Sequence, residues 1–256
     1  MSANPFSFAS LKESISQNFA LYVVAILILV GGFMGGSLWQ KAKMLEGGTS
    51  PTVAQPQAAA DQPTAPQGPP AEVLANMPAV TADDHIRGNL NAKVMLVEYS
   101  DYECPYCEKF HTTMQQVVEE YGSDVAWVYR HYPLSFHANA QKAAEAAECV
   151  ASIGGNEAFW KFSDLYYSRT DSSGTGIAIA DMPALAGEIG VSQSAVKTCL
   201  NGDQMKDTVQ AMFDTANSAG ISGTPGTLIV TANGVQELIP GALPIEQIKV
   251  MIDKYL

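Results

Sequence analysis

Two cysteines lie two residues apart in the stretch YSDYECPYCEKF, which runs from Tyr99 to Phe110. The residues that follow predict a helix that begins at these cysteines and ends before Gly122. The first turn of a helix leaves unpaired backbone N–H groups and the positive end of the helix dipole. Both stabilise a thiolate at Cys104, so we expect its pKa to lie below about 8.5.

The second cysteine, Cys107, lies one turn further along and can close a short disulfide with Cys104. Pro105 fixes the backbone between them without removing a useful donor. This arrangement predicts thiol–disulfide exchange, in which Cys104 forms a mixed disulfide and Cys107 resolves it. A zinc site is the alternative, but it needs four ligands, and the chain has no second CxxC and no suitable histidine pair. We therefore expect no bound metal, and no redox cofactor motif is visible.

The segments around this helix predict an α/β domain. The residues Lys93–Ser100 and Asp124–Arg130 are rich in Val and aromatic side chains and predict two buried strands that flank the helix. Several helical segments follow, over about residues 137–219. The stretch GTLIVTANGVQELIP then predicts two strands joined by a hairpin, and PIEQIKVMIDKYL predicts a closing amphipathic helix. The expected order is β-α-β, a helical insertion, and β-β-α.

The N-terminal part of the chain predicts a membrane anchor. After a short tail over residues 1–18, residues 19–40 are almost wholly apolar and carry no charge. Roughly 20 helical residues match a hydrocarbon core of about 30 Å, which favours a helix that spans the lipid bilayer. A cleaved signal peptide is the alternative, but its apolar region would be shorter, and here Trp39 and Lys41 follow. We interpret the segment as an uncleaved signal-anchor.

A linker separates this anchor from the globular domain. Residues 41–80 are rich in Pro, Ala, Gln and Thr and lack aromatic side chains, so we expect them to be disordered. The expected domain covers residues 81–256. The whole chain is acidic, because it has 26 Asp and Glu and only 14 Lys and Arg, which gives a net charge of −12. Nucleic acid as a partner is not expected, because phosphates need clustered cations.

Three stretches resemble the DsbA-like branch of the thioredoxin superfamily: GNLNAKVMLVEYSDYECPYC, YRHYPLSFHANAQKAAEAAEC and GTPGTLIV. The resemblance extends from about Asp83 to the C-terminus and implies a thioredoxin fold interrupted by a helical insertion. Because such proteins act in oxidising compartments, it implies that the domain lies on the extracytoplasmic side of the cell membrane. It also implies two partners, namely reduced, unfolded exported proteins as substrates and a membrane quinone-linked thiol oxidase that regenerates the disulfide.

The resemblance also assigns roles to residues outside the cysteine pair. It implies a cis bond between Thr224 and Pro225, which would offer backbone groups to an extended substrate. It matches Glu98 to a buried acid that handles the proton of Cys107; a solvated carboxylate at a sheet edge is the alternative. Tyr106 stands where DsbA proteins often have histidine. Tyrosine removes one positive partner of the thiolate and predicts a less oxidising pair.

The remaining cysteines, Cys149 and Cys199, fall in the predicted helical insertion. Relatives sometimes carry a second disulfide there, which would close a loop of about 50 residues and stabilise the fold by about 4 kcal/mol. Two buried free thiols are the alternative. His131 and His137 flank the sequence YPLSF and could approach the redox pair, although packing or capping is the simpler interpretation. Large aromatic side chains predict the core: Tyr102, Trp127, Tyr129, Phe159 and Trp160.

These expectations favour a thiol oxidase that donates the disulfide of Cys104 and Cys107. A disulfide isomerase or a membrane-tethered thiol reductant is the first alternative, and Thr224 favours it because isomerase-type relatives often carry threonine there. Isomerases usually dimerise through a folded N-terminal domain, however, and residues 47–78 are too poor in core side chains for one. A non-enzymatic scaffold with a structural CxxC is the other alternative, and it predicts that Cys104 resists alkylation.

Overall fold

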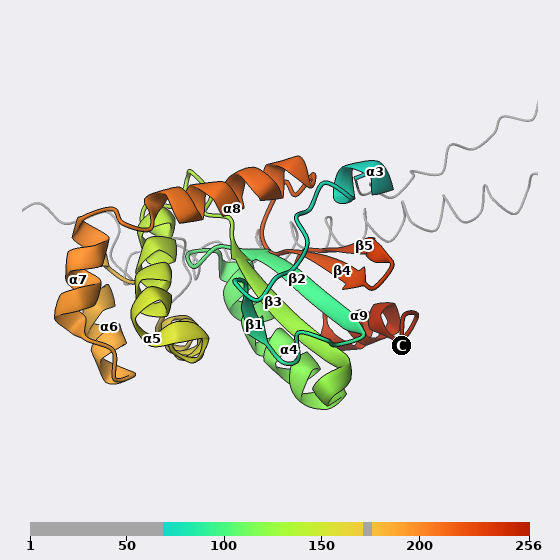
Figure 1. Ribbon diagram of the computed structural model, residues 1–256, viewed down its shortest axis with the longest axis horizontal. Helices are drawn as coiled ribbons and strands as arrows, with labels where there is room; N and C mark the ends of the chain where they lie inside the picture. The colour runs from blue at the N-terminus through green and yellow to red at the C-terminus, as the bar shows by residue number, and fades with distance from the viewer. Residues whose placement is uncertain (1–68, 171–175) are drawn as a thin grey trace, which may run out of the picture. The chain divides into compact units, whose positions relative to one another are not determined.

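A mixed sheet of five strands organises the part of the chain that the structure describes. The structure is a computed structural model, and it describes residues 69–170 and 176–256 (Figure 1). The strand order is β1-β3-β2-β4-β5, with β2 and β3 parallel and the other neighbours antiparallel. The strands are β1 (His85–Arg87), β2 (Val94–Ser100), β3 (Val125–His131), β4 (Gly226–Thr231) and β5 (Gly234–Pro240).

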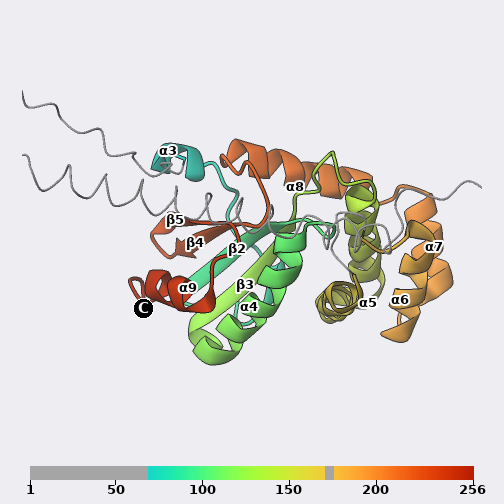
Figure 2. The same cartoon turned by 180° about the vertical axis from the view of Figure 1, so that it is seen from behind.

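The central strands are buried on both faces, as their near-continuous apolar sequences predict. Because side chains alternate along a strand, Leu96 and Trp127 pack on one face with the helices α4 (Pro105–Tyr121) and α9 (Ile245–Ile252). Val97 and Val128 pack on the opposite face. Figure 2 shows α4 and α9 in front of the sheet. The predicted β-α-β and β-β-α units are both present.

The helix that carries the cysteines begins and ends where the sequence predicts. α4 begins at Pro105, directly after Cys104, and its last residue is Tyr121. Gly122 follows with a φ of 56°, a conformation that glycine adopts without steric cost. Since β2 ends at Ser100, a turn of only four residues joins the centre of the sheet to the helix start. This short turn fixes the position of both cysteines.

The predicted helical insertion is also present. Its first helices lie at one end of the domain, away from α9, and its last helix runs from there back toward the middle of the domain (Figure 1). Its helices are α5 (Ala140–Arg169), the short 3-10 helix η2 (Ile179–Asp181), α6 (Met182–Glu188), α7 (Gln193–Asn201) and α8 (Lys206–Ser218). A disulfide joins Cys149 of α5 to Cys199 of α7, as the resemblance implies. The alternative of two free thiols is therefore wrong.

The domain begins earlier than the sequence predicts. Residues 69–80 belong to the expected linker, yet they form the helix α3 (Ala71–Leu74) and bury Leu74 and Met77. These two large apolar side chains, in a segment otherwise poor in them, pack beside β5 and the sheet face opposite α4. The linker prediction is thus wrong for this part.

Arg130 of β3 holds the end of this N-terminal segment. Its guanidinium donates hydrogen bonds to both carboxylate oxygens of Asp84, to the Tyr99 hydroxyl and to the backbone carbonyls of Pro78 and Ala79. The side chain is almost fully buried, so the charge needs these partners.

The expected tail over residues 1–18 and the anchor over residues 19–40 lie outside the described residues. No helix within residues 69–170 and 176–256 is long and apolar enough to cross a membrane.

A buried cluster of one glutamate and two histidines, the Glu148 cluster, connects the insertion to the sheet. Glu148 of α5 accepts a hydrogen bond from His85 Nε2 at 2.8 Å, and its carboxylate lies 3.0 Å from His131 Nε2. Burial alone would raise the pKa of Glu148, but the contacts with His131 and His85 hold it well below the ordinary value. The cluster's contribution to stability is therefore present above the unfolded pKa of about 4.5 and is lost as the pH falls.

We predict that Glu148→Gln lowers the free energy of unfolding at pH 7 by about 3 kcal/mol, because two buried histidines lose their ionised partner. The difference from the wild type should narrow below pH 4. Urea denaturation at both pH values measures it. Glu157→Gln, a fully exposed position on the same helix, is the control and should change stability little. Equal stability of Glu148→Gln and the wild type at pH 7 would contradict the prediction.

Candidate active site

The two cysteines occupy the start of α4. Cys104 is the N-cap residue with an extended backbone, and Pro105 opens the helix. The Cys107 N–H donates to the Cys104 carbonyl at 3.0 Å. Both are free thiols in this structure. Cys107 is fully buried, and Cys104 keeps only 4% of its surface exposed. Neighbouring residues therefore cover most of the Cys104 side chain.

The environment of Cys104 favours the thiolate, as its place at the helix start predicts. Its pKa is lowered from 9.0 to about 6, chiefly by a hydrogen bond from the Cys107 thiol. Burial opposes the shift, while the Thr224 side chain and the backbone N–H groups of Cys107 and Tyr106 lower the pKa further. At neutral pH the reduced protein therefore holds a negative charge on Cys104.

The environment of Cys107 has the opposite effect. Burial raises its pKa well above 9.0, and the hydrogen bond to Cys104 and the negative charge of Cys104 raise it further. The backbone N–H of Asp101 contacts the Cys107 sulfur at 3.5 Å. Cys107 thus remains protonated while Cys104 is ionised. Its attack on a mixed disulfide requires a group that accepts its proton.

Glu98 is a buried carboxyl group that can accept this proton, and its charge acts on Cys107. It lies in the middle of β2 and accepts a hydrogen bond from Trp127 Nε1 at 2.8 Å. Burial raises its pKa to about 7, although hydrogen bonds from Ser100 and Trp127 lower it. The interpretation of Glu98 as a solvated edge carboxylate is therefore wrong. A carboxyl group that titrates near neutrality can both accept and return a proton.

The loop before β4 covers the Cys104 sulfur. The Thr224–Pro225 peptide bond is cis. When protonated, the Cys104 thiol donates to the Thr224 carbonyl at 3.4 Å. The Thr224 hydroxyl is buried and has no oxygen or nitrogen partner among the described residues. A cavity of about 250 Å³ lies beside this loop and is lined by residues 221–226 and 238–241. The loop therefore joins the reactive sulfur to a surface recess.

The two histidines named from the sequence contact carboxylates. His131 belongs to the Glu148 cluster, and His137 Nδ1 lies 2.8 Å from Asp101 Oδ2. Asp101 also accepts hydrogen bonds from the backbone N–H groups of Glu103 and Leu134. The histidines therefore pack and orient neighbouring groups, in agreement with the simpler interpretation. The five predicted aromatic core residues are all buried.

Sequence reasoning missed three buried polar residues beside the cysteines: Ser100, Asp101 and Glu103. Asp101 anchors the loop after β3, and Glu103 accepts a hydrogen bond from the Asn139 backbone at 2.7 Å. The other oxygen of Glu103 has no hydrogen-bond partner within the part of the chain that the structure describes. The signal was present in YSDYEC, where two carboxylates lie within three residues before Cys104.

One group within the described residues has donor atoms suited to a metal ion: His85, His131 and Glu148. His85 Nε2 and Glu148 are within hydrogen-bonding distance, His131 Nε2 lies 3.0 Å from the same carboxylate, and all three side chains are buried. We therefore interpret the group as the Glu148 cluster that connects α5 to β1 and β3.

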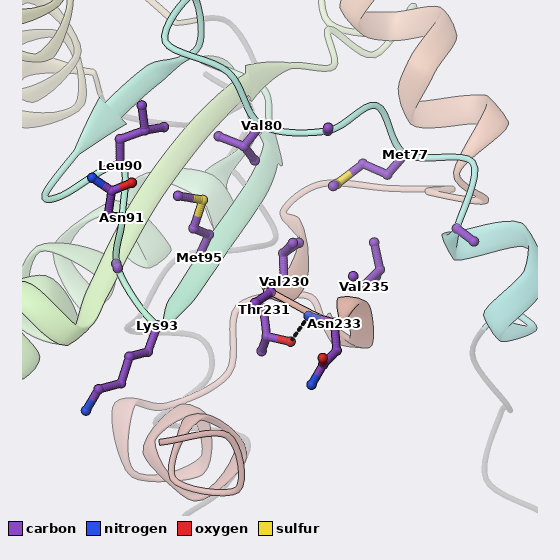
Figure 3. A pocket seen from close by; sticks show the side chains of 15 residues that line it. Met77, Val80, Leu90, Asn91, Lys93, Met95, Val230, Thr231, Asn233 and Val235 are labelled. Carbon is purple, nitrogen blue, oxygen red and sulfur yellow. Dashed lines mark hydrogen bonds between the residues drawn. The ribbon is translucent and has the colours of Figure 1, made fainter.

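A separate apolar cavity of about 730 Å³ lies near α3 and the turn between β4 and β5 (Figure 3). Met77, Val80, Met95 and Val235 line it, and Lys93 is its only ionisable lining residue. Neither redox cysteine reaches it. The thiol chemistry is therefore confined to the site at the start of α4.

A family model described as thioredoxin matches residues 80–254. The chain belongs to this thioredoxin family. The match covers the sheet, the cysteine-bearing helix and the insertion together. It therefore agrees with the fold that the sequence predicts for residues 81–256.

Solved structures with this fold include three bacterial proteins. DsbA2 of Pseudomonas aeruginosa is 25% identical, with a TM-score of 0.60 over 70% of this chain and 97% of that one. The catalytic domain of ScsC from Proteus mirabilis is 24% identical, with a TM-score of 0.58 over 72% and 97%. Oxidised BdbD of Bacillus subtilis is 21% identical, with a TM-score of 0.59 over 67% and 92%. With DsbA-type neighbours, the chain is a thiol–disulfide oxidoreductase.

Curated relatives by sequence are named Na(+)/H(+) antiporters. NhaA 3 of Salinispora tropica is 35% identical over 143 residues, which are 56% of this chain but 21% of the antiporter. NhaA 1 of Salinispora arenicola is 32% identical over 143 residues, which are 56% of this chain and 21% of that antiporter. The chain thus spans about a fifth of the length of these relatives.

We predict that alkylation of the reduced protein by iodoacetamide rises with pH around a midpoint near 6, because the thiolate is the reactive form. Cys107→Ala should move the midpoint upward toward 9, since it removes the hydrogen bond that lowers the Cys104 pKa most. Mass spectrometry measures the rate at Cys104. A wild-type midpoint at or above 8 would refute the stabilised thiolate.

Proposed function

We propose that this chain is an extracytoplasmic thiol oxidase that donates the disulfide of Cys104 and Cys107 to exported proteins. The observation that carries the proposal is the pKa of Cys104, which falls to about 6. A pair whose reduced form is stabilised as a thiolate gives up its disulfide readily. The DsbA-type structural neighbours support thiol–disulfide exchange as the chemistry.

The proposed reaction proceeds by two exchanges. A substrate thiolate attacks the Cys104 sulfur, the bond to Cys107 breaks, and Cys107 leaves with the electron pair and takes a proton from Glu98. A second substrate thiolate then attacks the substrate sulfur of the mixed disulfide, and Cys104 leaves as the stabilised thiolate. Two electrons pass from the substrate to the cysteine pair, and the substrate gains one disulfide.

The surroundings of Cys104 suit an unfolded substrate. The cavity beside Thr224 can receive an extended segment, and backbone groups of the loop can pair with it. Tyr106 and Phe136 add apolar surface, with 62% and 76% of their areas exposed. Reduced, unfolded chains expose both an extended backbone and apolar side chains. These features favour unfolded exported proteins as substrates.

Two further parts of the proposal concern location and recycling. Residues 19–40 would anchor the protein in the lipid bilayer of the cell membrane, with the catalytic domain on the extracytoplasmic side. A membrane quinone-linked thiol oxidase would restore the disulfide after each cycle. The apolar sequence of residues 19–40 and the resemblance to DsbA-like proteins support these assignments.

We predict that the fragment 69–256, equilibrated with glutathione, has a reduction potential above about −180 mV, as an oxidase requires. The fragment begins at residue 69 because α3 packs against the domain. A value near −270 mV would identify a reductant and refute the proposed direction. An intermediate value would favour the alternative of a disulfide isomerase.

We predict that Cys104→Ser abolishes oxidation of a reduced, unfolded substrate, since it removes the sulfur that the substrate attacks. Cys107→Ser in the reduced form should accumulate a mixed disulfide at Cys104 when mixed with an oxidised peptide. Non-reducing electrophoresis detects both outcomes. Wild-type oxidation by Cys104→Ser would show that the scaffold alternative, with a structural CxxC, is the better description.

We predict that Glu98→Gln stabilises the reduced protein while it slows catalysis. Burial raises the folded pKa, so stability is lost as the pH rises from 4.5 through about 7. Glu98→Gln should therefore be more stable than the wild type at pH 8.5 by about 3 kcal/mol, and equally stable near pH 4. Urea denaturation and substrate turnover at pH 7 test the pair of effects. Loss of stability at pH 8.5 would contradict the assignment.

A further inference from the structure

The Glu148 cluster brings together three metal-ligating side chains from three elements. His85 is the first residue of β1, His131 is the last residue of β3, and Glu148 lies on α5. All three side chains are buried, and one donor atom of each lies within 4.8 Å of the other two. Both histidines place Nε2 near the same atom, Glu148 Oε1, at 2.8 and 3.0 Å. Three donor atoms therefore converge on one small volume.

Hydrogen bonding does not explain the position of His131. Its side chain is fully buried, yet neither Nδ1 nor Nε2 has a hydrogen-bond partner within the described part of the chain. The distance of 3.0 Å from Nε2 to Glu148 Oε1 is short enough for a hydrogen bond, but the two groups are not aligned for one. A fully buried polar ring without a partner is costly and uncommon in folded proteins.

The distances in the cluster fit a metal ion. Bonds of about 2.1 Å from a divalent metal to imidazole nitrogen and carboxylate oxygen place ligands at right angles about 3 Å apart. The separations of Glu148 Oε1 from the two Nε2 atoms, 2.8 and 3.0 Å, match this value. Burial also lowers the pKa of His131, so its ring is neutral at pH 7 and has a lone pair to donate to a metal.

Packing fixes the orientation of both imidazole rings. The His85 ring stacks on Phe159 with 3.6 Å between the ring centroids, and the His131 ring contacts Phe159 and Tyr129 edge to face. Rings that are already oriented lose little freedom when they bind an ion. The His85 and Glu148 side chains keep 9% and 8% of their surfaces exposed, so an ion and a water ligand can reach the cluster from this side.

We propose that His85, His131 and Glu148 bind a divalent transition-metal ion such as Zn²⁺. Two imidazole nitrogens and one carboxylate oxygen form a donor set that such ions prefer. Ca²⁺ and Mg²⁺ prefer oxygen ligands, so the two histidines select against them. None of the four cysteines takes part. The site is therefore independent of the thiol chemistry and differs from a zinc site at the CxxC motif.

A bound ion would stabilise the attachment of the insertion to the sheet. The three ligands come from β1, β3 and α5, and only the folded protein brings them together. An ion that binds the folded state and not the unfolded chain raises the stability of the fold by mass action. We therefore expect the midpoint of thermal unfolding to rise when Zn²⁺ is added.

Isothermal titration calorimetry tests the site on the untagged full chain in detergent, in the oxidised form. With Cys104 joined to Cys107 and Cys149 joined to Cys199, no thiolate competes for the metal. We predict that one Zn²⁺ binds per chain and that excess Ca²⁺ does not displace it. Co²⁺, whose visible absorption reports its ligands, should give ligand-field bands without a sulfur charge-transfer band. This wild-type measurement does not depend on the folding of any variant.

We predict that His85→Gln, which keeps a polar side chain beside Glu148, weakens Zn²⁺ binding at least about 100-fold. Glu148→Gln, which removes the anionic ligand, should weaken it to a similar extent. His137→Gln is the matched control, because His137 is also a histidine 2.8 Å from a carboxylate, that of Asp101, but lies outside the cluster. Zn²⁺ should raise the unfolding midpoint of the wild type and of His137→Gln, and leave that of His85→Gln unchanged.

Absence of saturable Zn²⁺ binding to the wild type would overturn the inference. Equal affinity of the wild type and His85→Gln would also overturn it, because the ion would then lie elsewhere. Displacement of Zn²⁺ by Ca²⁺ would refute a site built on imidazole ligands. The reduction potential tests the oxidase proposal independently of these results.

Discussion

One negative charge, held by the Cys104 sulfur and absent from the Cys107 sulfur, determines how this domain works. A thiol–disulfide enzyme needs one cysteine that reacts with substrate and one that waits, and both begin as identical side chains. The hydrogen bond from the Cys107 thiol, together with the N–H groups at the start of α4, places the charge on Cys104. Complete burial raises the pKa of Cys107 well above 9.0, so this thiol stays protonated. The short turn after β2 fixes this difference in place.

The helical insertion completes what the sheet and α4 begin. Tyr102, Tyr166 and Tyr167 form a layer of rings behind the cysteines, and this layer excludes water from Glu98 and Cys107. Exclusion of water raises the pKa of both groups, which makes Glu98 a proton acceptor near neutrality. The Glu148 cluster attaches α5 to two strands, so the ring layer keeps its position relative to the redox pair.

The sequence predicted the frame well and the polar interior poorly. Strong periodicity and punctuation located β2, α4 and the insertion, and the resemblance supplied Glu98 and the pair Cys149 and Cys199. Ser100 and Asp101 were missed because their roles depend on contacts with α5 and the loop after β3, which are far away in the sequence. The N-terminal boundary was missed because composition averages over a window, whereas the segment around α3 contributes just two buried large side chains, Leu74 and Met77, among the described residues.

The guanidinium of Arg130 has a mechanical consequence. Tension applied through the N-terminal end of the domain acts first on α3, whose few apolar contacts can break one after another. It then acts on the hydrogen bonds of the Arg130 side chain, which belongs to the fully buried strand β3. A load of this kind therefore enters the sheet at β3, through a side chain on the face opposite α4 and the redox pair.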